Sequence, residues 1–188
     1  MKYPNAQLVI VLTVLYLACP VARASDTPTQ PKVDSTDLAQ RIHRLVNVER
    51  KKHKLPALSW DSALARIAHR HSHDMAQRNY LSHDSPQGQG FRDRYQQGDY
   101  HCLVTVGKTL YGGAENIALG RLYNTVTRIN GYATYDWNTA QDIARKTVEG
   151  WMKSSSHREN ILTPHWKREG IGVDIAPNNR VLITQNFC

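Results

Sequence analysis

The chain has 188 residues, with 24 lysine and arginine residues against 16 aspartate and glutamate residues, so its formal net charge is +8. That length predicts one domain, and a content of 40% apolar and 21% charged residues excludes collagen-like, coiled-coil and wholly disordered chains. No apolar run reaches the roughly 18 residues that span a bilayer, which excludes a multi-pass membrane protein.

The N-terminus predicts an export signal. Lys2 supplies a positive start, and Leu8 to Cys19 form an apolar stretch of roughly twelve residues, the length of a signal-peptide core. Small residues in Ala22-Arg23-Ala24 place cleavage before Ser25, so residues 1–24 are expected to be removed. The alternatives are an uncleaved membrane anchor and a lipid-bearing Cys19.

Cleavage would change the charge and the cysteine count. It removes Lys2 and Arg23 and no acid, so the formal charge falls from +8 to +6. Cys102 and Cys188 then remain, and in an oxidising compartment their pairing is the one intramolecular disulfide possible. Two free thiols are the alternative. A charge of +6 also favours retention at an acidic envelope or polysaccharide through salt-sensitive attraction.

Residues 25–34 read as a flexible leader, and one domain is expected over residues 35–188. Its first helix begins at Ser35-Thr36-Asp37, which supplies the N-cap, and apolar residues follow at helical spacing. The basic run Arg50 to Lys54 ends this helix. We interpret the run as charge that complements the C-terminal helix dipole, because no nucleic-acid-binding motif accompanies it. No nucleic-acid partner is expected.

A second helix is predicted from about Asp61 to Arg78. His71 falls on its apolar stripe and is expected to be a hydrogen-bonded core histidine. His69 and His73 are four residues apart, as in some metal sites, but they point away from the stripe and no HExxH pattern is present. We therefore place both of them on a solvated face.

The second half of the chain predicts one helix and two hairpins. The helix runs from Thr139 to about Lys153, with Thr139 and Asp142 as a capping pair, and Ser154-Ser155-Ser156 end it just before His157. Asn130-Gly131 predicts a hairpin turn between residues 125–129 and 132–137. Alternating residues predict a second hairpin from segments 171–175 and 181–185.

The first hairpin is rich in aromatic residues, with Tyr123, Tyr132, Tyr135 and Trp137 in or beside it. It has two interpretations. The aromatic side chains form the rim of a binding groove, or the segment is a peripheral insertion that packs on itself.

Four short stretches carry the residues best suited to chemistry. They are His83 in LSHDSP, Glu115 in GAENI, Glu149 in EGWM and His157 in HRENIL. In this order they resemble the CAP superfamily, also called SCP/TAPS, which includes the cysteine-rich secretory, antigen 5 and pathogenesis-related 1 proteins. The similarity covers residues 36–188 and is strongest to short bacterial members.

The resemblance implies an α/β fold, an α-β-α sandwich with a central antiparallel sheet between helical layers. It also implies a surface cleft lined by His83, Glu115, Glu149 and His157. Ala114 and Ser156 stand where the family commonly has glycine, and both residues restrict the backbone more than glycine does.

The chemistry of such a cleft has two interpretations. Neutral imidazoles of His83 and His157 suit Zn²⁺, with Glu115 and Glu149 orienting the rings or activating a bound water. A site with only two protein ligands should bind Zn²⁺ weakly and exchange it readily. Its affinity for the ion should fall further at low pH. The alternative is a polar network that joins helices to the sheet without any metal.

The expected function is that of a secreted or envelope binding module for a lipid, glycan or protein ligand. The alternative is a zinc-assisted peptidase or phosphoesterase that uses the same cleft, with Glu115 or Glu149 as general base. The sequence offers no convincing nucleophile, which favours the binding module. The ligand and the oligomeric state stay open.

Overall fold

The computed structural model describes residues 29–188. The predicted signal, its cleavage position, Cys19 and the first residues of the leader lie outside this range. Within it, every helix is too short or too polar to span a bilayer. The elements are, in chain order, α1 (Ser35–Lys52), β1 (Ser59–Trp60), α2 (Ser62–Gln77), α3 (Phe91–Gln97), β2 (Val104–Val106), β3 (Thr109–Tyr111), β4 (Ala114–Arg121), β5 (Tyr123–Ile129), β6 (Tyr132–Trp137), α4 (Ala140–Lys153), α5 (Ser155–Leu162), β7 (Arg168–Ile175) and β8 (Arg180–Phe187).

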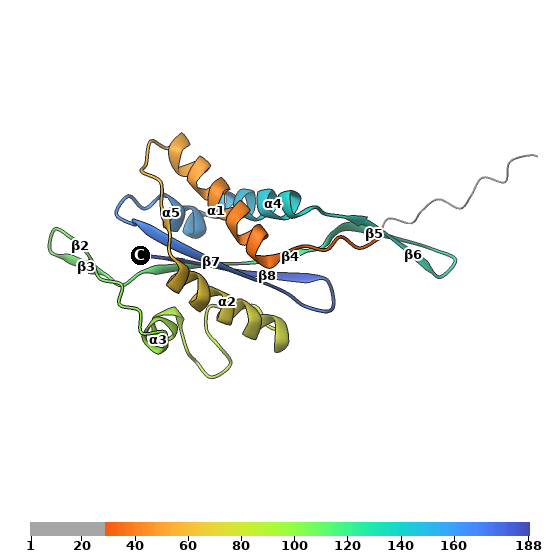
Figure 1. Cartoon of the computed structure of the whole chain (residues 1–188), viewed down its shortest axis with the longest axis horizontal. Helices are drawn as coiled ribbons and strands as arrows, with labels where there is room; N and C mark the ends of the chain where they lie inside the picture. The colour runs from red at the N-terminus through yellow and green to blue at the C-terminus, as the bar shows by residue number, and fades with distance from the viewer. Residues whose placement is uncertain (1–28) are drawn as a thin grey trace, which may run out of the picture.

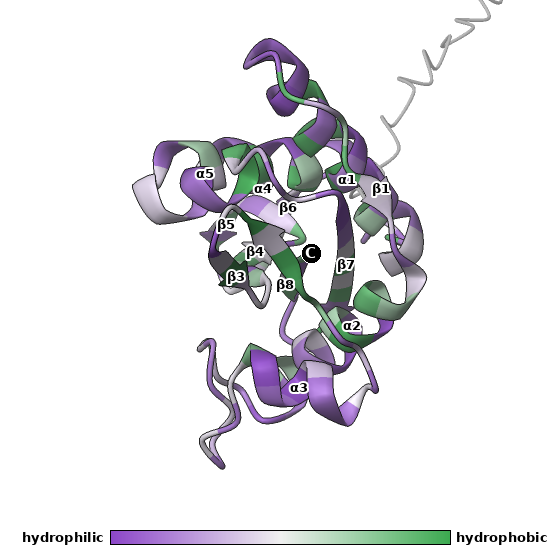
Figure 2. Ribbon diagram, turned by 90° about the vertical axis from the view of Figure 1, so that its left-hand side faces the viewer, coloured by the Kyte–Doolittle hydropathy of each residue, from purple (hydrophilic) through white to green (hydrophobic). Residues whose placement is uncertain are grey.

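A four-stranded sheet in the order β1-β7-β8-β4 forms the middle layer. Strand β8 is antiparallel to both neighbours, and the short β1 adds a parallel edge. Helices α1, α4 and α5 lie on one face and α2 and α3 on the other, as Figure 2 shows along the long axis. This arrangement confirms the predicted sandwich.

Two glycines let α2 lie directly on the sheet. A Cβ atom on Gly172 would lie 2.0 Å from the main-chain nitrogen of His69, and one on Gly170 would lie 2.1 Å from that of Ala65. No side chain fits at either position, since real Cβ atoms do not approach a backbone so closely. The helix therefore packs against β7 through backbone contact.

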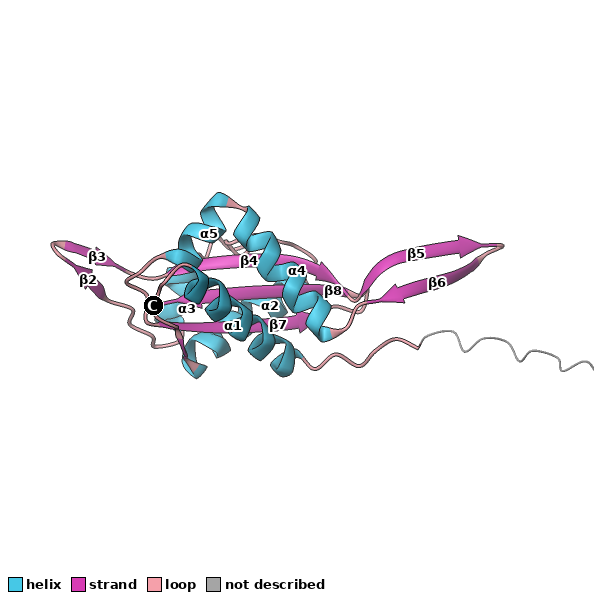
Figure 3. Ribbon diagram, turned by 90° about the horizontal axis from the view of Figure 1, so that it is seen from above, coloured by secondary structure: helices cyan, strands magenta, loops and turns pink. Residues whose placement is uncertain are grey.

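Two hairpins project from opposite ends of the molecule (Figures 1 and 3). One is β5–β6, in which Asn130 and Gly131 have φ values of 50° and 82°, as the predicted two-residue turn requires. Near its base the rings of Tyr123, Tyr135 and Trp137 lie 4.7–6.3 Å apart, centroid to centroid. The aromatic residues thus contact one another, as in the peripheral alternative. The other projection is β2–β3, which the sequence did not predict.

Most predicted helix ends are confirmed. The side chain of Asp61 caps α2, and Thr139 and Asp142 form the reciprocal cap of α4. The N-cap of α1 was wrong by one residue: Asp34 caps this helix, because its carboxylate accepts the N–H of Asp37 at 2.8 Å.

The placement of His157 just beyond the end of α4 is confirmed, but the short helix α5 that carries it was not predicted. Ser154 adopts an extended conformation, with φ −87° and ψ 125°, and this residue both ends α4 and begins α5. His157 therefore lies in the first turn of α5, where a new helix fixes its direction.

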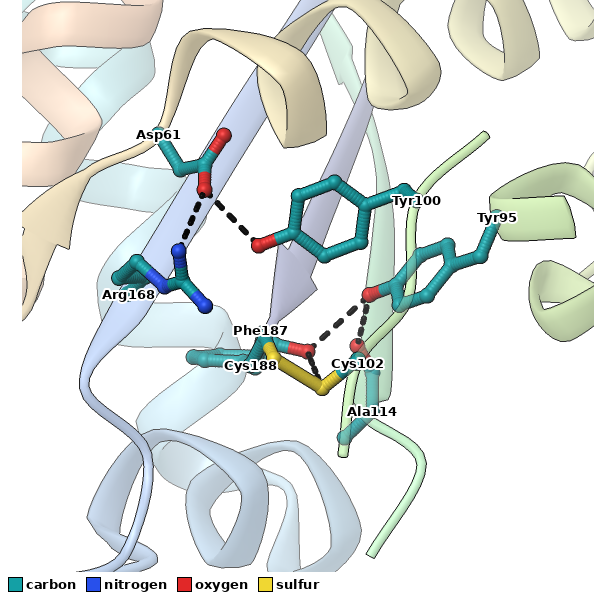
Figure 4. Close-up of a disulfide and its surroundings, with 8 residues drawn as sticks. All are labelled: Asp61, Tyr95, Tyr100, Cys102, Ala114, Arg168, Phe187 and Cys188. Carbon is teal, nitrogen blue, oxygen red and sulfur yellow. Dashed lines mark hydrogen bonds and ion pairs between the residues drawn. A yellow bond between two sulfur atoms is a disulfide. The ribbon is translucent and has the colours of Figure 1, made fainter. Parts of the chain in front are cut away.

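The two cysteines of the described region form the predicted disulfide, Cys102–Cys188. It joins the end of β8 to the segment that precedes β2 (Figure 4). Beside it the hydroxyl of Tyr95 donates to the main-chain oxygens of Phe187 at 3.1 Å and Ala114 at 3.4 Å. Together these bonds hold the same end of β8 and β4 to α3.

Candidate functional site

Three of the four predicted site residues meet at the start of β4, the outer strand of the sheet. Nδ1 of His83, from the loop after α2, lies 2.9 Å from Oε1 of Glu115 on β4. The His83 side chain is half exposed, whereas the Glu115 carboxylate is buried. Burial lowers the pKa of His157 on α5, and the nearby His83 charge lowers it further. The two imidazoles therefore share one region, and His157 favours its neutral form.

Arg94 fixes the carboxylate of this site. Its Nη2 donates to both oxygens of Glu115, at 2.9 and 2.7 Å, and to the main-chain oxygen of His83 at 2.9 Å. Both partners of the ion pair are buried. On the opposite side of the loop, His71 binds the main-chain oxygen of Ser82 at 2.9 Å, which confirms it as a hydrogen-bonded core histidine. The loop that carries His83 is thus held from two directions.

A chain of polar side chains runs beneath the site, across the face of the sheet covered by α1. Asn160 donates to Asn116 at 2.9 Å, and Asn116 donates to Gln185 at 3.0 Å. Gln185 donates to Glu169 at 2.5 Å, and the other Glu169 oxygen lies 2.6 Å from Nδ1 of His43. Three strands and two helices are therefore linked through hydrogen bonds rather than apolar contact alone.

The same asparagines hold the site backbone. The Asn160 amide donates to the main-chain oxygen of Glu115, and the Asn116 amide donates to that of His157, both at 3.2 Å. The Asn116 amide is fully buried and would be costly to leave unpaired, whereas Asn160 is partly buried. The relative position of β4 and α5 follows from these two bonds.

Glu149 lies on the exposed side of α4. Its carboxylate accepts from Arg145 at 3.1 and 3.3 Å, a pair one helical turn apart. Its side chain is half exposed, and no hydrogen bond joins it to the described histidines. A role for Glu149 in the cleft stays a prediction.

The donor set limits what metal these residues can hold. Within residues 29–188 no group of three or more histidine, cysteine, aspartate or glutamate side chains has a metal-binding arrangement. Both Glu115 oxygens are committed to Arg94. Two imidazoles remain as ligands, and Nε2 of His83 is free of hydrogen bonds to the described residues. A weak ion held by these two imidazoles stays a prediction.

Sequence reasoning missed most of the supporting residues. Arg94 lies on a seven-residue helix without an apolar repeat, so no local pattern points to it. Asn116 and Asn160 stand within the quoted stretches GAENI and HRENIL, but no role was assigned to either. A polar residue at an inward position of a strand is the signal that could have identified Asn116, but the strand itself was not predicted.

Comparison with known proteins gives the family. The model of the cysteine-rich secretory protein family, CAP, matches residues 43–187. This chain belongs to that family. The CAP match covers every element of the site, from α2 through β8, so the site residues lie within the family domain.

Relatives of this CAP protein come from several bacteria. It is 35% identical over 156 residues to "Uncharacterized membrane protein YlbC" of Bacillus subtilis, covering 83% of this chain and 35% of that protein. An SCP-domain extracellular protein of Bacillus anthracis is 28% identical, with a TM-score of 0.59, covering 85% of this chain and 44% of the other. An outer surface protein of Borrelia burgdorferi is 17% identical, with a TM-score of 0.61, covering 85% and 97%. The CAP chain spans about a third to a half of the curated relatives it matches.

Proposed function

We propose that this CAP protein works outside the cytoplasm as a binding module, with a ligand site at the His83–His157 cleft. The extracellular and outer surface proteins among its structural relatives support the location. The arrangement of the site residues supports binding rather than turnover. Its histidines reach solvent, and its one buried carboxylate is already neutralised.

The Arg94–Glu115 pair carries this proposal. A general base must accept a proton from substrate or water, and it must lie within reach of that proton. Glu115 lies beneath His83 and is held by a guanidinium at 2.7 Å, so protonating it would leave the buried Arg94 charge unpaired. Glu149, the other candidate base, faces solvent with Arg145. Neither carboxylate is poised for acid–base catalysis.

The metal part of the proposal is a weak, exchangeable Zn²⁺ ion. His83 and His157 would hold it through neutral imidazoles, and Glu115 would orient His83 through its Nδ1. Bound zinc would supply Lewis acidity or bridge to a ligand. Because protons compete for both imidazoles, its affinity should fall as the pH falls.

Zinc titration by calorimetry tests this part, with the chain from Ser25 onward. The expected result is saturable binding that the double variant His83→Ala/His157→Ala loses. The variant His69→Ala/His73→Ala is the matched control, because that pair lies four residues apart on the exposed side of α2. Equal binding by wild type and the cleft variant would overturn the zinc assignment.

A thermal-shift screen with lipids, glycans and peptides tests the binding module. The expected result is a ligand that raises the Tm of the wild type but not of the cleft variant. No saturable ligand in any of these three classes would count against the module. Peptide or phosphoester hydrolysis that a chelator stops, and that Glu115→Gln/Glu149→Gln loses, would instead support the zinc-assisted hydrolase.

A further inference from the structure

A second candidate site lies at the end of the molecule that carries the β2–β3 hairpin (Figure 3). It is a cavity of about 620 Å³ between this hairpin, the segment before β7 and the end of β8. Its lining includes the basic residues His101, His165, Lys167 and Arg168, together with the hydroxyl groups of Ser59 and Thr105. No aspartate or glutamate is part of the lining. The cavity shares no residue with the His83–His157 cleft.

Its basic side chains have few partners. Lys167 is exposed and makes no ion pair with any described residue. Arg168 is half exposed, lies 3.6 Å from a carboxylate oxygen of Asp61 and stacks near the ring of Tyr100 (Figure 4). The main-chain N–H groups of Lys167 and Arg168 both bind the main-chain oxygen of Cys188, at 2.9 and 2.8 Å. Both side chains therefore leave a backbone segment that is fixed beside the disulfide.

The hairpin beside the cavity exposes apolar residues. The exposed fractions are 68% for Leu103, 60% for Leu110 and 44% for Val106. Lys108, next to the turn glycine Gly107, is exposed as well and has no ion-pair partner among residues 29–188. Leu110 pairs with Thr105 and so lies on the opposite face of the hairpin from Val106, which means that the hairpin exposes aliphatic side chains on both of its faces. Exposed apolar side chains that gather in this way mark interaction surfaces.

We propose that the β2–β3 hairpin and the adjacent cavity dock this protein on a bilayer that carries anionic phosphate headgroups. Leu103, Leu110 and Val106 would enter the boundary between headgroups and acyl chains, while Lys108 and Lys167 pair with the phosphates. The argument is charge complementarity, because Lys108 and Lys167, which have no ion-pair partner among residues 29–188, stand beside exposed apolar side chains. Surface-bound segments commonly combine these two features.

Vesicle co-sedimentation tests this proposal with the disulfide-bonded chain from Ser25, which contains the whole described core and both bridged cysteines. The probes are vesicles of equal parts phosphatidylglycerol and phosphatidylcholine, and vesicles of phosphatidylcholine alone. Strong, salt-sensitive binding to the first and weak binding to the second are expected. Lys108→Gln/Lys167→Gln should weaken binding about 25-fold, since each basic residue near such a surface accounts for about fivefold. Leu103→Ser/Leu110→Ser should weaken it roughly tenfold or more.

The β5–β6 hairpin provides the matched control. Ile129 and Tyr132 are 67% and 81% exposed at the opposite end of the molecule, so Ile129→Ser/Tyr132→Ser removes similar apolar surface elsewhere (Figure 1). This variant should bind like the wild type. Equal binding to both kinds of vesicle, or equal loss in both hairpin variants, would overturn the proposal. Displacement by inorganic phosphate beyond that by chloride at matched ionic strength would also overturn it, in favour of a site for soluble phosphate.

Discussion

One nitrogen of Arg94, Nη2, donates to both carboxylate oxygens of Glu115, and the two side chains are buried together under the His83 loop. The pair links α3 to the outer strand β4, and the same nitrogen also binds the main chain of His83. The position of His83 relative to Glu115 therefore depends on a buried residue of α3.

Arg94→Gln should destabilise the fold by about 3–5 kcal/mol, because it leaves the Glu115 carboxylate buried without its counter-charge. Urea unfolding measures the loss. Arg92→Gln is the control, since Arg92 is an exposed neighbour on the same helix that stacks on Phe91. If the two variants lose similar amounts of unfolding free energy, the buried Arg94–Glu115 pair does not stabilise the fold as expected.

Reduction of the Cys102–Cys188 bridge should lower the free energy of unfolding by about 4 kcal/mol in the chain-entropy model. The bridge closes a loop between two residues that are 86 apart in the sequence. The free energy of unfolding is compared with and without reductant. Cys102→Ser/Cys188→Ser should match the reduced wild type and should not respond to reductant. A double variant as stable as the oxidised protein would contradict this expectation.

Lowering the pH should reduce the free energy of unfolding through protonation of His71 in the unfolded chain. Burial lowers the pKa of this side chain below its unfolded value of 6.5, so below that pH the unfolded chain binds more protons than the folded one. Stability therefore falls as the pH drops below about 6.5, by at most about 1.4 kcal/mol per pH unit for this group. The burial-lowered pKa values of His157 and His165 add to the same trend.

The measurement is urea unfolding of the wild type and of His71→Gln, which keeps a donor for Ser82, at about pH 7.5 and about pH 5.5. The variant should lose less stability between the two conditions. His53→Gln, at an exposed position after α1, should behave like the wild type. An equal loss in all three proteins would remove His71 as the cause.

Replacing Gly172 or Gly150 with alanine should change the stability of the fold in opposite directions. Gly172→Ala places a Cβ atom 2.0 Å from the His69 backbone and should cost at least about 3 kcal/mol, since α2 must move off the sheet. Gly150→Ala has no atom within 4 Å and lies in α4, so it should gain roughly 0.5–1 kcal/mol. Thermal unfolding of the two variants separates these effects. A stable Gly172→Ala protein would show that α2 does not need this close approach.

The elements that the sequence predicted are those whose signals are local. Apolar spacing and cap residues marked α1, α2 and α4 within one or two residues of their ends, and Asn130-Gly131 marked the β5–β6 turn. The layered fold came from the family resemblance, because no local pattern states which strands become neighbours.

The interior of the site escaped prediction because its partners are distant in the sequence. Arg94 and Glu115 are 21 residues apart, and Asn116 and Gln185 are 69 apart. Only the fold brings such residues together. By contrast, the partner of Glu149 was within reach of sequence reasoning, since Arg145 precedes it by four residues on the same helix.

The position of β8 has a consequence for the order of folding. This strand follows the other strands in the sequence, yet it lies between β7 and β4 in the sheet. Strands β7 and β4 do not pair with each other. During synthesis from the N-terminus, β4 emerges about sixty residues before the strand that completes the sheet. Helices can form earlier from local contacts, but the sandwich closes only when β8 joins the sheet. The central sheet of this domain therefore cannot form before β8 is available to pair with both β7 and β4.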